Sequence, residues 1–87
     1  MIVDSSALLE RAVDDVLVSA FQSAGQRCSA LRMLYIQEDI ADRLTQMICE
    51  AAAELEVGSP NRTDTDIGPF IDAQAKRCID QYVFAAK

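Results

Sequence analysis

Hydrophobic residues recur with the period of an α-helix near the start of the chain. After an apolar stub, residues 1–3, come Asp4, Ser5 and Ser6, whose side-chain oxygens can cap the free N–H groups of a first helical turn. The hydrophobic side chains then form two adjacent rows at a spacing of four, comprising Leu8, Leu9, Ala12, Val13, Val16, Leu17, Ala20 and Phe21. This pattern predicts a short strand followed by an amphipathic helix that stops at Gly25.

A shorter apolar run and a second helical pattern follow. Residues 31–36 are largely apolar and include the aromatic Tyr35 and the β-branched Ile36, so they predict a buried strand. Asp39 is placed to cap a second amphipathic helix, and Gly58 and Pro60 are placed to end it. The hydrophobic face of that helix consists of Ile40, Leu44, Met47, Ile48, Ala51, Ala52 and Leu55.

The last third of the chain predicts a loop and a third helix. Residues 59–66 are polar and aperiodic, as in an exposed loop, and Gly68 and Pro69 indicate a turn. Asp72 is placed to cap a helix that continues to Lys87. The order strand, helix, strand, helix, loop, helix predicts an α/β fold with parallel strands. Two strands and three helices bury little surface, so we expect the chain to be part of a larger domain.

Composition and charge exclude several classes of function. The 87 residues suit one small globular unit, and the net charge of −6 disfavours nucleic acid and anionic membranes as partners. No apolar run approaches the roughly 18 residues that span a bilayer. The chain has no histidine, which excludes Ser-His-Asp triads, Cys-His dyads and most zinc sites.

The three cysteines are odd in number and form no Cys-x-x-Cys pair, so we expect reduced thiols in the cytoplasm. Most lone cysteines are small buried hydrophobes, and Cys49 and Cys78, in or beside helical apolar stripes, are expected to be structural. Cys28 differs because it lies in a polar, Gly-containing turn between a helix and a predicted strand, where a side chain can face a cleft.

The residues around Cys28 carry a family resemblance. The pattern Phe-x-x-x-Gly-Gln-x-Cys, formed by Phe21, Gly25, Gln26 and Cys28, resembles the catalytic-cysteine motif of NAD(P)-dependent aldehyde dehydrogenases. Similar anchors recur downstream in the order found in that family, namely Gln37-Glu38-Asp39, Gly58-Ser59-Pro60, Ile67-Gly68-Pro69 and Asp72.

Within that family, residues 1–6 and 23–32 most resemble 1-pyrroline-5-carboxylate dehydrogenases, above all the dehydrogenase half of bacterial bifunctional proline utilisation enzymes. One departure from the wider family is that its common Ser-Arg pair is Leu31-Arg32 here.

The resemblance implies a thiol mechanism in proline catabolism. Cys28 would attack the aldehyde carbon of L-glutamate γ-semialdehyde, hydride would pass to NAD, and water would release L-glutamate from the thioester. Ser29 would help to bind the α-carboxylate of this small substrate. FAD would be a further cofactor if the parent enzyme also carries a proline-oxidising domain.

Cys28 follows the C-terminal end of a predicted helix, whose dipole disfavours a thiolate, and Arg27 offers partial compensation. In the family, the general base, the asparagine that binds the oxyanion and the nucleotide-binding domain all lie upstream of the segment resembled here. We therefore expect residues 1–87 to be a catalytic-domain fragment that lacks the nucleotide-binding domain, is inactive alone and belongs to a cytoplasmic homo-oligomer.

Three alternatives stay open at the level of sequence. The chain could be a non-enzymatic interaction module that keeps the fold segment without activity. The parent could oxidise a different aldehyde. Ser29 could cap its turn instead of binding substrate.

Overall fold

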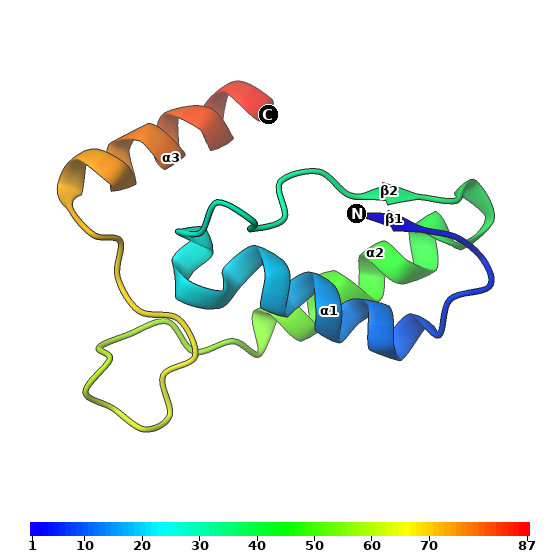
Figure 1. The fold of residues 1–87 in the computed structure, drawn as a ribbon, viewed down its shortest axis with the longest axis horizontal. Coiled ribbons are helices and arrows are strands. Elements are labelled where there is room, and N and C mark those ends of the chain that lie inside the picture. Colours follow the sequence, from blue (N-terminus) through cyan, green and yellow to red (C-terminus); the bar gives the residue numbers. More distant parts are fainter.

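The computed structural model describes residues 1–87 as an α/β unit (Figure 1). Its elements in chain order are β1 (Ile2–Val3), α1 (Leu9–Phe21), a short turn η1 (Gln22–Gly25), β2 (Tyr35–Ile36), α2 (Glu38–Ala53) and α3 (Ala73–Ala86). The two strands are parallel, with Ile2 opposite Tyr35 and Val3 opposite Ile36. The predicted fold class, element order and parallel pairing are confirmed.

The second strand is shorter and more exposed than its composition predicts. Regular pairing is confined to Tyr35 and Ile36, not the whole of residues 31–36. Met33 and Tyr35 are 59% and 63% exposed, whereas Leu34 and Ile36 are half-buried, so side chains alternate between two faces. The prediction of a buried strand is therefore wrong for this chain, because only one face of the strand pair is covered by helices.

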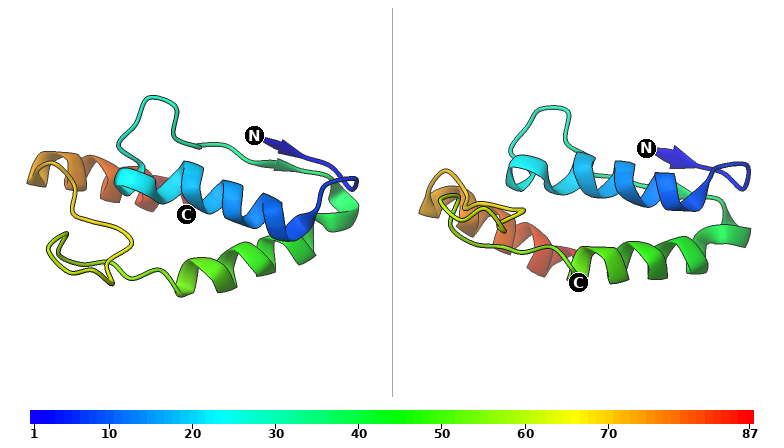
Figure 2. Two further views of the ribbon diagram at one scale, coloured as in Figure 1. Left: turned by 60° about the horizontal axis from the view of Figure 1, so that its bottom comes forward. Right: turned by 90° about the horizontal axis from the view of Figure 1, so that it is seen from below.

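The core lies where α1 and α2 pack side by side against the inner face of the strands (Figure 2). Val3 from β1, Ala12 and Val13 from α1 and Leu44 from α2 form one buried cluster, and Leu44 is completely buried. Both helical stripes therefore lie where the 3.6-residue period places them.

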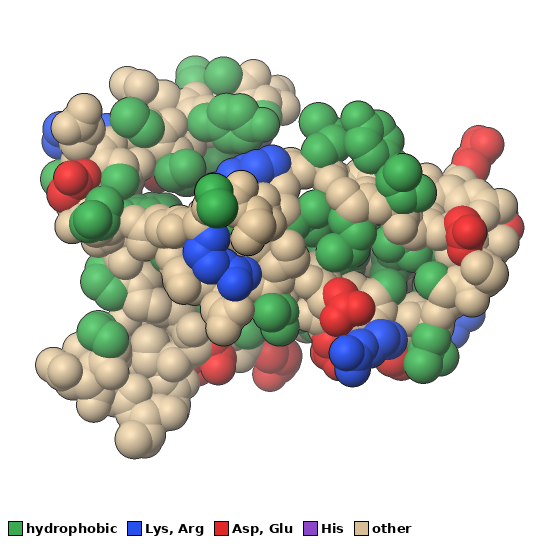
Figure 3. Space-filling view, viewed as in Figure 1, with side chains coloured by type: hydrophobic (Ala, Val, Ile, Leu, Met, Phe, Trp, Pro, Cys, Tyr) green, Lys and Arg blue, Asp and Glu red, His purple; other side chains and the backbone are tan.

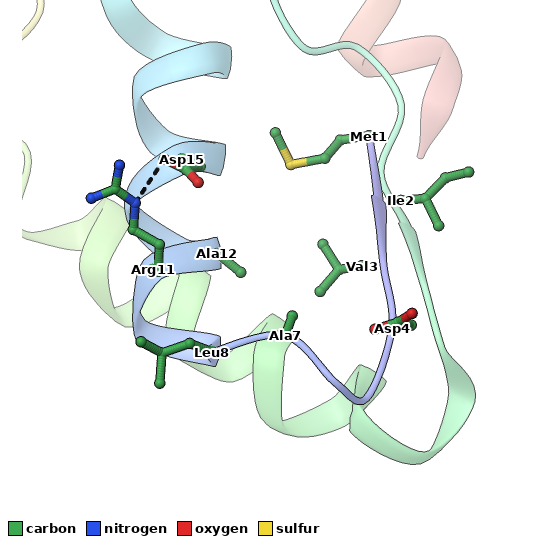
Figure 4. Close-up of a pocket in the computed structure, with 9 residues that line it drawn as sticks. All are labelled: Met1, Ile2, Val3, Asp4, Ala7, Leu8, Arg11, Ala12 and Asp15. Carbon is green, nitrogen blue, oxygen red and sulfur yellow. Dashed lines mark ion pairs between the residues drawn. The ribbon is translucent and has the colours of Figure 1, made fainter.

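Figure 4 shows how β1 faces α1 across a shallow groove of about 420 Å³. Val3 points from the strand toward Ala12, while Ile2 points away, as expected for alternate residues of a strand. On the outer side of α1, Arg11 forms an exposed ion pair with Asp15 at 3.5 Å. Because that pair is exposed, it stabilises the helix only slightly.

Neither of the first two helices begins with the predicted cap. The carboxylate of Asp4 accepts hydrogen bonds from the backbone N–H and the hydroxyl of Ser6, which forms a turn upstream of α1, and Leu8 occupies the N-cap without a side-chain bond. For α2 the N-cap is Gln37, not Asp39, because Gln37 N–H donates to Val3 O at 2.9 Å and the strand runs directly into the helix.

The third helix has the predicted cap. The carboxylate of Asp72 accepts from the backbone N–H of Ala75 at 2.7 Å. The polar loop before it is exposed, as predicted, and a parallel bridge between Val57 and Ile67 closes it at its base. α3 has no buried residue. No helix is long and apolar enough to cross a membrane.

Candidate functional site

The site begins where α1 ends in an unusual backbone turn. Ser23, Ala24 and Gly25 have φ values of 58°, 54° and 69°, so three successive residues are left-handed. This conformation is unfavourable for residues with a Cβ, and such strain is typical of functional sites. At Gly25 a Cβ would also come within 2.9 Å of Ala20 O, so only glycine fits. The sequence correctly places the helix stop here, although α1 itself ends earlier, at Phe21.

Two arginines stabilise the C-terminal end of α1. Arg27 Nη2 donates to Val18 O at 3.2 Å, and Arg32 Nη2 donates to Gly25 O at 2.5 Å. The carbonyl groups at a helix C-terminus carry partial negative charge, which these guanidinium groups offset. The compensation expected from Arg27 is thus made through the helix carbonyls. Arg32 shares this role, which no local pattern predicts.

The turn that carries Cys28 and Ser29 is anchored on both sides. Ala30 N–H donates to Arg27 O at 3.1 Å, and Leu31 N–H donates to Ser19 O at 3.1 Å. Ala30 is buried, whereas Cys28 and Ser29 are exposed. The thiol of Cys28 is free, and no hydrogen bond within the chain involves the hydroxyl of Ser29. The turn therefore presents a thiol and an adjacent hydroxyl to a reactant.

Gln26 joins this turn to a distant part of the chain. Its Oε1 accepts from the backbone N–H of Ile71 at 2.7 Å, and its Nε2 donates to Ser23 O at 3.1 Å. One side chain thus connects the left-handed turn to the segment just before α3. The sequence motif includes Gln26 but predicts no role for it. Its position two residues before Cys28 is the one feature of the sequence that points to such a role.

Two apolar grooves lie beside the turn, on the side of α3. The larger, of about 720 Å³, is lined mainly by Phe21, Ala24, Ile67, Pro69 and Phe70. The smaller, of about 450 Å³, continues past Gln26, Arg32, Cys78 and Ile79. Cys28 and Ser29 line neither groove, so the chain does not by itself enclose the space in front of the thiol.

The other cysteines do not form part of this site. Cys49 on α2 and Cys78 on α3 are both free and exposed. Both are more exposed than a place in or beside an apolar stripe predicts, because Cys49 lies at the edge of its stripe and α3 buries no residue. Their structural role stays a prediction. The chain contains no cluster of three or more side chains suited to a metal ion.

Comparison with known proteins points to one family. The whole of residues 1–87 matches the aldehyde dehydrogenase family. The chain is 56% identical over its full length to the bifunctional protein PutA of Klebsiella aerogenes. It is 36% identical, again over its full length, to the 1-pyrroline-5-carboxylate dehydrogenase of Anoxybacillus flavithermus.

The solved structures agree. A proline utilization A (PutA) variant from Bradyrhizobium japonicum superposes with a TM-score of 0.93 at 47% identity, covering 97% of this chain and 9% of that one. An NAD-dependent aldehyde dehydrogenase from Sinorhizobium meliloti also superposes with a TM-score of 0.93, at 30% identity, covering 97% of this chain and 17% of that one. The chain spans only 7% of the Klebsiella protein and 17% of the Anoxybacillus protein.

Proposed function

Because the chain belongs to the aldehyde dehydrogenase family, we propose that it is the nucleophile-bearing segment of a 1-pyrroline-5-carboxylate dehydrogenase in proline catabolism. That enzyme would oxidise L-glutamate γ-semialdehyde to L-glutamate with NAD. The observation that carries the proposal is the exposed, free thiol of Cys28 on an anchored turn. The relatives named PutA and 1-pyrroline-5-carboxylate dehydrogenase support the assignment of the enzyme.

Cys28 acts as the nucleophile in this proposal. Its thiolate attacks the aldehyde carbon, a C–S bond forms, and the π electrons of the carbonyl move to oxygen to give a tetrahedral oxyanion. An ordinary thiol is only slightly ionised near neutral pH, so a general base has to take its proton. No carboxylate hydrogen-bonds to Cys28 within the chain, so that base comes from outside these residues.

Ser29 supplies substrate selectivity. It is exposed next to Cys28, and its hydroxyl has no partner within the chain. A hydroxyl one residue from the attacking sulfur can donate to the carboxylate of a short substrate whose aldehyde is at the sulfur. This arrangement favours a small amino-acid semialdehyde over an aldehyde without a carboxylate.

The residues present do not fit a dinucleotide. Such sites use a glycine-rich turn that opens a helix and receives the phosphates. Here Gly25 is closed off by Ala20 O and the guanidinium of Arg32, and Gly58 and Gly68 lie in separate turns of the loop region. We therefore propose that NAD binds elsewhere in the enzyme.

The apolar side chains of α3 need a covering surface that residues 1–87 do not supply. Tyr82, Val83 and Phe84 on α3 are exposed together, and Figure 3 shows hydrophobic side chains gathered over that helix. We propose that the enzyme is a homo-oligomer. Since all three cysteines are free, we also propose that it is cytoplasmic.

The test is oxidation of the semialdehyde by the full-length protein that carries these residues. We expect NADH formation that depends on both substrates and disappears in Cys28→Ala, with Cys49→Ala as the matched control. The 87-residue chain alone should form no NADH, because the base and the cofactor site lie outside it. Full activity in Cys28→Ala would refute the assignment of the nucleophile.

The role of Ser29 has its own test. Ser29→Ala in the full-length protein should weaken binding of the semialdehyde by roughly 1.5–3 kcal/mol, as expected for the loss of a hydrogen bond to a charged group. Aldehydes without a carboxylate should be affected far less. An equal loss of kcat/KM for both classes of aldehyde would show that Ser29 is structural.

A further inference from the structure

The side chain of Gln26 makes the longest-range side-chain hydrogen bond within the part of the chain around Cys28. Forty-five positions separate Gln26 from Ile71, whose backbone N–H donates to Oε1 at 2.7 Å. The other end of the same amide, Nε2, donates to Ser23 O at 3.1 Å. An amide with both ends bonded is held in one orientation, so Gln26 acts as a rigid link.

Of the two segments that Gln26 links, the one before α3 is the more exposed, whereas residues 23–25 are also held by Arg32, which donates to Gly25 O. The segment that leads into α3 is largely exposed, Ile71 is 84% exposed, and α3 buries no side chain. On the other side, the left-handed residues 23–25 are held in a strained conformation by local hydrogen bonds, among them the bond from Gln26 N–H to Ser23 O at 3.0 Å. Loss of the Gln26 side chain would therefore release the segment before α3 and remove one of the hydrogen bonds that hold residues 23–25.

Cys28 lies only two residues beyond this link. The direction of the thiol depends on how the backbone leaves Gly25. That backbone is held by Gln26 and Arg32 on one side and by the buried Ala30 on the other. Attack on a carbonyl needs the sulfur to be held close and in line with the carbon, and a displacement of about 1 Å costs on the order of 100-fold in rate.

We propose that Gln26 is a positioning residue for Cys28. The side-chain amide of Gln26 fixes the nucleophile turn, residues 23–30, against the segment before α3. This role rests on the proposed function. It makes the rate of attack at Cys28 depend on the hydrogen bond between Gln26 and the backbone of Ile71.

The experiment compares three variants of the full-length protein. Gln26→Met keeps the length of the side chain but removes both hydrogen bonds. Gln26→Glu keeps an oxygen that accepts from Ile71 N–H and removes the donor to Ser23 O. The matched control is Gln74→Met, since Gln74 is exposed on α3 and its side chain makes no hydrogen bond within the chain.

Two readouts are measured. Hydrogen exchange at the Ile71 amide should speed up about tenfold in Gln26→Met, as for loss of one hydrogen bond, and should stay near the wild-type rate in Gln26→Glu. For the semialdehyde, kcat should fall on the order of 100-fold in Gln26→Met with KM changed much less, and by a smaller factor in Gln26→Glu. Gln74→Met should leave both readouts unchanged.

The outcomes distinguish a failure of the positioning role from a failure of the proposed function. Unchanged exchange at Ile71 in Gln26→Met would overturn the link, and unchanged kcat despite faster exchange would overturn the positioning role. A similar fall in kcat in Gln74→Met would also overturn it, because a general loss of folded enzyme lowers the apparent kcat and leaves KM unchanged whichever side chain is replaced. If the wild-type protein oxidises no aldehyde, the proposed function fails and the positioning role fails with it.

Discussion

Residues 1–55, the N-terminal region, and residues 56–87, the C-terminal region, are covered to very different extents. All seven buried residues of the chain lie in the N-terminal region, where β1, α1 and α2 cover one another. The C-terminal region buries none, although it carries Ile71 and Phe84, which are 84% and 83% exposed. Both regions contain amphipathic helices. The hydrophobic faces of α1 and α2 are packed in the core, whereas α3 buries no residue.

A hydrophobic face shows that a helix needs a partner surface, but it does not show which part of the structure supplies that surface. The faces of α1 and α2 find each other because a strand and a short turn bring them together within this chain. The face of α3 finds nothing equivalent. The turn that carries Cys28 belongs to the packed N-terminal region, and Gln26 links it to the thinly held segment before α3 in the C-terminal region.

The sharpest test of the comparison is truncation of one apolar side chain in each region. Leu44→Ala should lower the free energy of unfolding by about 2–5 kcal/mol, because Leu44 is completely buried in the core. Val83→Ala, at a side chain that is 45% exposed on α3, should change it by less than about 0.5 kcal/mol. Urea unfolding followed by circular dichroism measures both, and equal losses would contradict the division into two regions.

The next largest effect is expected at the glycines. Gly25→Ala should destabilise the chain by about 1–3 kcal/mol, because φ is +69° and the new Cβ would lie 2.9 Å from Ala20 O. Gly68→Ala is the matched change in the C-terminal region, where a Cβ meets nothing within 4 Å, and it should be neutral or slightly stabilising. The same urea unfolding measures both changes. A clear loss of unfolding free energy in Gly68→Ala would contradict the open surroundings of Gly68.

A smaller effect is expected at the start of α3. Asp72→Ala should cost about 1 kcal/mol of helix stability, because it removes the acceptor for Ala75 N–H. Hydrogen exchange at the first amides of α3 measures this loss. Gln74→Ala is the control on the same helix and should leave exchange unchanged or slow it, since alanine favours helix. The effect should be confined to α3, because that helix supports no core.

The smallest effect concerns pH, and it allows one carboxyl group of each region to be compared. Hydrogen bonds from the hydroxyl and the N–H of Ser6 lower the pKa of Asp4, and a hydrogen bond from Arg62 lowers the pKa of Asp64, in each case from 3.8. A lowered pKa means that each carboxylate contributes its stabilisation above pH 3.8 and loses it as the pH falls through the folded-state value.

The measurement is an NMR titration of the two side-chain carboxyl carbons. Both carboxyl groups should titrate below pH 3.8. Protonation of Asp4 should loosen its turn with Ser6, and protonation of Asp64 should open its ion pair with Arg62. Ser6→Ala should return the pKa of Asp4 toward 3.8 and leave that of Asp64 unchanged. A titration of Asp4 at its ordinary value in the wild-type chain would show that the turn does not form in solution.

Local pattern was sufficient to predict most of the elements. The three helices, the stop at Gly25, the exposed loop and the cap at Asp72 follow from periodicity and from side chains that act on their own neighbours. The predicted caps at residues 4–6 and Asp39 were wrong, because Asp4 bonds to Ser6 and the strand pairing continues into α2. These errors arose where contacts distant in sequence decide between two local options.

The sequence by itself determined the α/β class, the positions of the amphipathic faces and the motif that singles out Cys28. A role for Ser29 was implied by the family resemblance alone. Only the tertiary structure decided that Tyr35 is exposed, that α3 lies uncovered and that Arg27 and Arg32 bind the carbonyl groups at the end of α1. It also decided that Gln26 reaches Ile71. The reason is that periodicity and residue type act over a few positions, whereas burial and long-range hydrogen bonds depend on which surfaces the folded chain brings together.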